Sequence, residues 1–132
     1  MEDNHIADAR ARNFVAALRK FEQDSDAAPL VALFATDAVT ERLDARGERH
    51  GEVEQFWQEY RAQFREIRTT FFNAVEGQDQ VALEWRSQAI LTDDRPLTYR
   101  GVTVIDLDGD AIVRLRTYYD SAAFVLVPAA TT

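Results

Sequence analysis

The sequence contains no cysteine and only one lysine, Lys20, among its 132 residues. Without cysteine the chain can form neither a disulfide framework nor a thiolate metal site. Its two histidines, His5 and His50, lie far apart in the sequence and make no recognisable metal-binding set, so we expect no metal and no other cofactor. The uninterrupted apolar runs, such as residues 124–127, are far too short to span a bilayer.

Acidic residues outnumber basic ones, 23 to 15, and the formal net charge is -8. Nucleic-acid backbones and anionic membranes attract clustered Lys and Arg, whereas the arginines here are scattered among acids. The N-terminal residues 1–14 are acidic and polar and have no apolar signal core. We therefore expect a cytoplasmic protein that binds neither nucleic acid nor membrane.

The residues that are present suit an ordinary globular protein. Apolar residues make up 46% of the chain and charged residues 29%, which is typical of a folded domain rather than a disordered chain. The length fits one domain over residues 1–132, with a core at about residues 8–126 and short flexible ends.

Two hydrophobic periods divide the chain. In the first half, apolar residues recur at steps of three and four, which is typical of helices. This pattern predicts helices over residues 7–21, 29–34 and 53–67, with a short strand over residues 38–43. The period then changes to two, and turn residues separate strands over residues 68–76, 80–91, 97–106 and 111–124. Short loops between successive strands indicate an antiparallel meander. We therefore predict an α+β fold, with three N-terminal helices packed on a strongly curved, mostly antiparallel sheet.

Alternation along the strands indicates which side faces the helices. Burying unpaired charge is costly, so the uncharged side of each strand should face inward. That side carries Val81, Leu83, Trp85, Ser87, Ala89 and Leu91 in one strand, and Val113, Leu115, Thr117 and Tyr119 in the last. The outer side mixes Arg86, Arg114 and Arg116 with Ile90, Ile112 and Tyr118. It is either a solvated face or a dimer contact, and we expect a homodimer through it.

Several short runs resemble one known group of proteins. The run Phe34-Ala35-Thr36-Asp37-Ala38-Val39 resembles the junction between second helix and first strand in the nuclear transport factor 2-like, SnoaL-like superfamily, which includes ketosteroid isomerases. Residues 99–104, 108–112 and 116–120 are similar to its last two strands. The resemblance covers about residues 8–126 and implies a cystatin-like cone. This fold hosts isomerases, hydrolases, cyclases and binding modules, so it does not imply one function.

The catalytic residues of those enzymes are replaced in this sequence. Arg42 stands where ketosteroid isomerases have their base aspartate, and arginine stays protonated at neutral pH. Gln88 and Thr117 stand where limonene-epoxide hydrolases have carboxylates. The resemblance therefore implies the fold without either of these reactions.

The residues best suited to a ligand pocket are apolar or aromatic, with a few polar groups among them. We predict a pocket formed by Phe14, Leu18, Arg42, Trp57, Tyr60, Trp85, Tyr99, Thr103, Leu115, Thr117 and Tyr119. The first hypothesis is a module that binds a small, largely apolar molecule, with Arg42 as a fixed charge. The alternative is an isomerase-, hydrolase- or cyclase-like enzyme that uses Glu41, His50 or Tyr119 as acid or base. A second alternative is a homodimeric accessory domain with a filled interior.

Overall fold

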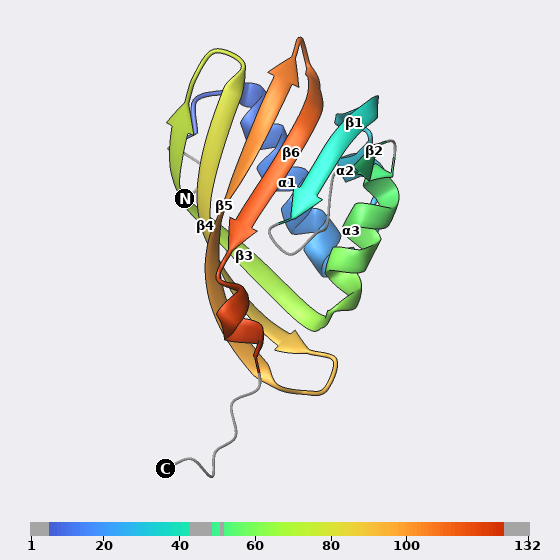
Figure 1. Ribbon diagram of the computed structural model, residues 1–132, viewed down its shortest axis with the longest axis vertical. Coiled ribbons are helices and arrows are strands. Elements are labelled where there is room, and N and C mark those ends of the chain that lie inside the picture. Colours follow the sequence, from blue (N-terminus) through green and yellow to red (C-terminus); the bar gives the residue numbers. More distant parts are fainter. Residues whose placement is uncertain (1–5, 43–48, 51, 126–132) are drawn as a thin grey trace.

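The computed structural model describes residues 6–42, 49–50 and 52–125, which form helices followed by a meander of strands (Figure 1). The order of elements is α1 (Ala9–Asp24), α2 (Ala28–Val31), β1 (Phe34–Arg42), β2 (Arg49–His50), α3 (Val53–Ala62), β3 (Phe64–Glu76), β4 (Gln80–Leu91), β5 (Pro96–Asp108), β6 (Ala111–Tyr119) and the short 3-10 helix η2 (Ser121–Phe124). The predicted α+β class, with three helices on a mostly antiparallel sheet, is confirmed. None of the helices in these ranges is long and apolar enough to cross a membrane.

Helix α1 forms because its apolar residues fall on one side and its first turn is capped. Asp8 precedes the helix and accepts hydrogen bonds from the backbone N–H groups of Arg10 (2.8 Å) and Ala11 (3.3 Å). Such a cap stabilises a helix by about 1 kcal/mol. The buried side of α1 carries Ala11, Phe14, Val15, Leu18, Phe21 and Glu22. It packs mainly on β3.

The sheet has the strand order β2-β1-β6-β5-β4-β3. The strands β3 to β6 pair antiparallel with their sequence neighbours, as the short loops require. Strand β1 instead pairs in parallel with β6. Parallel neighbours need a long connection between them, and α3 with strands β3 to β5 provides it. Helices α1 and α3 lie on one side of the curved sheet, and the core lies between the two layers (Figure 1).

Several predicted boundaries are wrong, and the second helix covers Ala28–Val31 rather than residues 29–34. The third helix ends at Ala62 rather than residue 67, and Phe64 and Ile67 are buried in strand β3 instead. Their spacing fits a helix and a strand equally well over so short a stretch. Strand β1 begins at Phe34, four residues before the predicted start at residue 38. The last strand ends at Tyr119, and η2 follows it.

The predicted inner face of β4 is confirmed at each of its six positions, which are all buried. The prediction for β6 is wrong at Ile112, which is 1% exposed and belongs to the core. The register between β5 and β6 shifts after Asp106, so Leu107 pairs with Ile112 while Asp106 pairs with Arg114. This bulge reverses the alternation before Arg114 and turns Ile112 inward.

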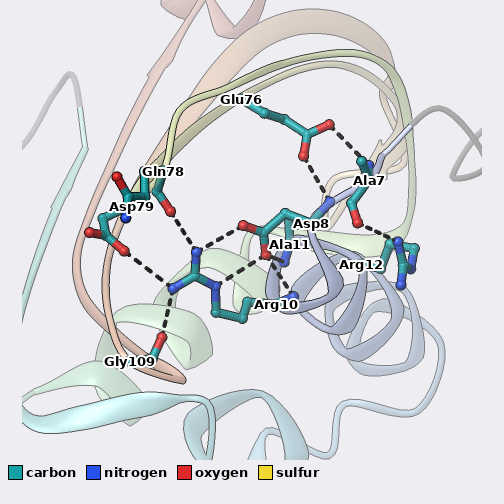
Figure 2. Close-up of polar contacts among 9 residues, drawn as sticks. All are labelled: Ala7, Asp8, Arg10, Ala11, Arg12, Glu76, Gln78, Asp79 and Gly109. Atoms are coloured by element: carbon teal, nitrogen blue, oxygen red, sulfur yellow. Dashed lines mark hydrogen bonds and ion pairs between the residues drawn. The ribbon is translucent and has the colours of Figure 1, made fainter.

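One arginine joins the start of α1 to the two hairpins at this end of the sheet (Figure 2). The Arg10 guanidinium donates to the backbone carbonyl oxygens of Gln78 (2.8 Å) and Gly109 (2.7 Å), which lie in the β3–β4 and β5–β6 turns. It also forms an ion pair with Asp8 (2.9 Å), the residue that caps α1. A planar guanidinium can serve these separate acceptors at once because its donors point in several fixed directions.

Candidate functional site

A small cavity lies between the helices and the sheet. It encloses about 40 Å³ and is bounded by residues from α1, α3 and five strands. Its lining residues are Leu18, Arg42, Phe56, Trp57, Tyr60, Thr69, Phe71, Trp85, Ser87, Thr103 and Thr117. On this scale a water molecule needs about 10–15 Å³, so the cavity has room for about three water-sized groups.

A buried carboxyl group lies directly behind this lining. Glu22, on α1, is 3% exposed. Its Oε2 atom accepts hydrogen bonds from the Tyr60 hydroxyl (2.7 Å) and from Thr69 Oγ1 (2.6 Å), and its Oε1 atom accepts one from the Thr69 backbone N–H (2.9 Å). Thr69 Oγ1 also lies 2.6 Å from Ser87 Oγ, so a chain of polar groups runs from α3 through α1 and β3 to β4.

This environment changes the acid–base behaviour of the groups in the chain. Burial raises the pKa of Glu22, although the hydrogen bonds from Thr69 and Tyr60 oppose that shift. Burial also raises the pKa of Tyr60 well above its usual value, and the Glu22 carboxyl adds to this shift. The pKa of Tyr99 is raised for the same two reasons. Both tyrosines therefore keep neutral hydroxyl groups at physiological pH.

A second group of polar atoms lies across the cavity, on β4 to β6. Trp85 Nε1 donates to Thr103 Oγ1 (2.9 Å), which lies 3.1 Å from Thr117 Oγ1. The Trp85 ring reaches this position by packing over Gly101 of β5, where a Cβ atom would collide with the ring. The indole N–H, a costly group to bury alone, is thus satisfied within the sheet.

The one lining arginine is engaged by its surroundings. Arg42 ends β1, and its side chain is 14% exposed. It forms an ion pair with Glu59 of α3 (3.2 Å), and its guanidinium lies 5.0 Å from the centre of the Phe56 ring. Its positive charge is therefore offset by the Glu59 carboxylate.

Seven of the eleven predicted pocket residues line the cavity: Leu18, Arg42, Trp57, Tyr60, Trp85, Thr103 and Thr117. The other four do not. Phe14 and Leu115 are fully buried in the core, and Phe14 packs behind the wall against Trp57 and Phe71. Tyr99 packs behind the wall against the lining residue Trp85, with ring centres 5.2 Å apart. Tyr99 and Tyr119 also form an aromatic group with Phe124, with ring centres 4.8–5.9 Å apart.

Two of the three candidate acid–base residues, Glu41 and Tyr119, are not among the residues that line the cavity. Glu41 accepts a hydrogen bond from Arg114 (3.1 Å) and is not among the lining residues. Tyr119 packs in the aromatic group with Tyr99 instead. The backbone of His50 lies in β2, but its side chain falls outside the described residues.

Sequence reasoning missed four lining residues and the acid behind them. Phe56 belongs to the apolar stripe of the third helix, and Ser87 to the inner face of β4, so a signal was present for both. Thr69 and Phe71 follow Ile67 at steps of two on the inner face of β3. The inner and outer faces of this strand were not predicted from the sequence. Glu22 follows Leu18 by four residues and so lies on the buried side of α1, where an acid is unusual.

Metal binding has no support in the described parts of the chain. Across residues 6–42, 49–50 and 52–125, no group of three or more His, Asp or Glu side chains could hold a metal ion. The cavity lining offers hydroxyl groups, aromatic rings and the Arg42 guanidinium instead, and the Glu22 carboxyl group lies behind it.

Comparisons with known proteins agree with this architecture. A family model described as a SnoaL-like domain matches residues 11–115. A solved NTF2-like protein from Anabaena variabilis is similar, with a TM-score of 0.80, 16% identity and 92% of each chain covered. A protein with a ketosteroid isomerase-like fold from Catenulispora acidiphila, in complex with trimethylamine, has a TM-score of 0.73 and 18% identity, covering 83% of this chain and 87% of its own. TerC, co-crystallised with polyporic acid, has a TM-score of 0.72 and 13% identity, covering 88% and 95%. No curated protein sequence matches the chain at a significant level.

Proposed function

This chain belongs to the SnoaL-like domain family, and from that premise we propose that it binds a small, predominantly apolar molecule in the cavity between its helices and sheet. The observation that carries the proposal is the composition of the lining, in which five aromatic rings and a leucine surround a few placed hydroxyl groups. Binding sites for small molecules are commonly built in this way, with apolar walls for affinity and a few polar groups for orientation.

The size of the cavity limits the ligand to a few heavy atoms unless the walls move, because it has room for only about three water-sized groups. Related folds support both possibilities. One structurally similar protein is described with trimethylamine, a molecule of that size, and another with the larger polyporic acid. A larger ligand would require displacement of the side chains that close the cavity here.

Thermal unfolding with a library of small molecules tests this function. A ligand at 100 times its dissociation constant should stabilise the protein by about 2.7 kcal/mol. Thr117→Leu fills space in the cavity and should abolish that stabilisation. Thr98→Leu, at an exposed position on β5, is the matched control and should leave it intact. If no compound in the library stabilises the protein, or if the two variants are stabilised equally, the proposal is contradicted.

We also propose that two copies associate through the outer face of the sheet. Phe72 and Tyr118 are 48% and 47% exposed, and both line a shallow depression on this face. The depression also contains Glu84, Arg100 and Asp120, so it offers charges of both signs. A two-fold contact places such a surface against itself and can pair these opposite charges.

A further inference from the structure

We propose that the molecule bound in this cavity is a small organic cation, a quaternary or protonated amine, held by the aromatic walls and the nearby Glu22 carboxyl group. This inference rests on the proposed function and names its ligand class. Three features carry it: the rings of the lining, the position of the acid and the balance of the other charges.

The lining is suited to a cation that carries apolar substituents. Five of its eleven residues are aromatic, and two of these are the tryptophans Trp57 and Trp85. Aromatic faces attract ammonium groups, with tryptophan the strongest, and cages of such rings are a common means of binding quaternary ammonium ions. The wall already contains one contact of this kind, between Arg42 and the Phe56 ring.

Glu22 lies one hydrogen bond behind the wall. Both Tyr60 and Thr69 contact the carboxyl group directly, and both line the cavity. A positive charge in the cavity would therefore lie one side chain away from the carboxylate, within a water-poor interior where charges interact strongly. The cation would stabilise the ionised form of Glu22, and burial alone disfavours that form.

The other charged and titratable groups around Glu22 do not outweigh its attraction for a bound cation. Helix α3 contributes Tyr60 and Arg61, and β5 contributes Tyr99. The two tyrosines are neutral, and Arg61, which lowers the pKa of Glu22 less than the hydrogen bonds from Thr69 and Tyr60 do, donates to the Phe64 carbonyl oxygen. The charge of Arg42, which also lines the cavity, is offset by Glu59. The net charge of -8 favours the approach of cations to the whole molecule.

Calorimetric titration with three probes of similar size tests the ligand class. The probes are tetramethylammonium, the uncharged tert-butanol and the anion acetate, at equal ionic strength. We expect tetramethylammonium to bind about tenfold tighter than tert-butanol, and acetate to bind weakest. As the pH falls through the raised pKa of Glu22, affinity for tetramethylammonium should decrease because Glu22 becomes protonated, while affinity for tert-butanol stays constant.

The variant Glu22→Gln should remove both the preference for the cation and its pH dependence. Glu66→Gln, at an exposed position on β3, is the matched control and should preserve both. If Glu22→Gln does not fold, the pH dependence of the unaltered protein decides the question. Equal or tighter binding of tert-butanol, or cation binding independent of pH, would overturn this inference and leave the proposed function standing. Absence of binding by every probe and by the wider library would overturn both.

Discussion

At the scale of single residues, Glu22 is the buried acid among the residues that the structure describes. Its pKa is raised above the ordinary 4.5 by burial, so the folded protein holds the proton to higher pH than the unfolded chain does. The folded state therefore binds more protons in the interval between the two pKa values. Stability from this group is greatest below pH 4.5 and is lost as the pH rises through the raised pKa.

This linkage predicts how Glu22→Gln changes the free energy of unfolding. Gln has nearly the same shape but does not ionise, so the variant should gain stability relative to the unaltered protein as the pH rises from 4.5 toward neutral. Urea unfolding at a series of pH values measures the difference. Glu22→Ala, in contrast, leaves the Thr69 N–H and the Tyr60 hydroxyl without their acceptor and should cost about 1–3 kcal/mol. A difference between Glu22→Gln and the unaltered protein that does not change with pH would contradict the prediction.

Single residues of the cavity could be predicted from the sequence where a strong pattern marked them. Trp85 stood on the uncharged side of a strand with strict alternation, and Trp57 stood in a clear helical stripe. Glu22 was missed because an acid in an apolar stripe becomes informative only when its hydrogen-bond partners are known. Those partners, Thr69 and Tyr60, are 47 and 38 residues away in the chain.

At the scale of elements, α1 is held to the sheet by a contact with a testable consequence. Arg10 connects α1 to the turns at Gln78 and Gly109 (Figure 2). Lysine keeps the charge but has one compact donor group, so it cannot reach both carbonyl oxygens and Asp8 together. Arg10→Lys should therefore lower the melting temperature and accelerate amide hydrogen exchange in both turns.

The control for this prediction is Arg12→Lys. Arg12 donates to the carbonyl oxygens of Ile6 (2.9 Å) and Ala7 (2.7 Å), which both precede α1 in the same segment, so its loss should not affect the turns. Calorimetry and hydrogen exchange with mass spectrometry measure the two effects. Equal exchange in the turns of the two variants would show that Arg10 does not hold the hairpins.

Most elements could be predicted from their hydrophobic period, but not all of their ends. Strand β4 was predicted with its observed bounds because alternation persists over twelve residues and turn residues flank it. The end of α3 was not predicted correctly, because Phe64 and Ile67 continue the helical spacing even though they pair with β4. Pairing between distant segments decided the structure there, and a local pattern does not contain it.

At the scale of the whole molecule, the fold followed from the order of helices and strands, but the size of the interior did not. The same set of inward-facing residues could enclose a large space or fill it. The observed result is a small cavity of about 40 Å³, because the rings of Phe56 and Phe71 also occupy the interior. How closely side chains from separate elements interlock depends on their orientations, which alternation does not specify.

Association of two molecules through the outer sheet face leads to the last prediction. Tyr118→Asp places a charge at the centre of the exposed depression, where a two-fold contact would bring two such charges together and desolvate them. The variant should shift the protein from dimer to monomer, as measured by light scattering on a sizing column. Val125→Asp, at a 62% exposed residue outside the depression, is the matched control and should leave the mass unchanged. If the unaltered protein is a monomer across the concentration range, or if Tyr118→Asp stays dimeric, the outer face is solvated. The arginines and acids of this face would then serve only to hydrate the outer surface of the sheet.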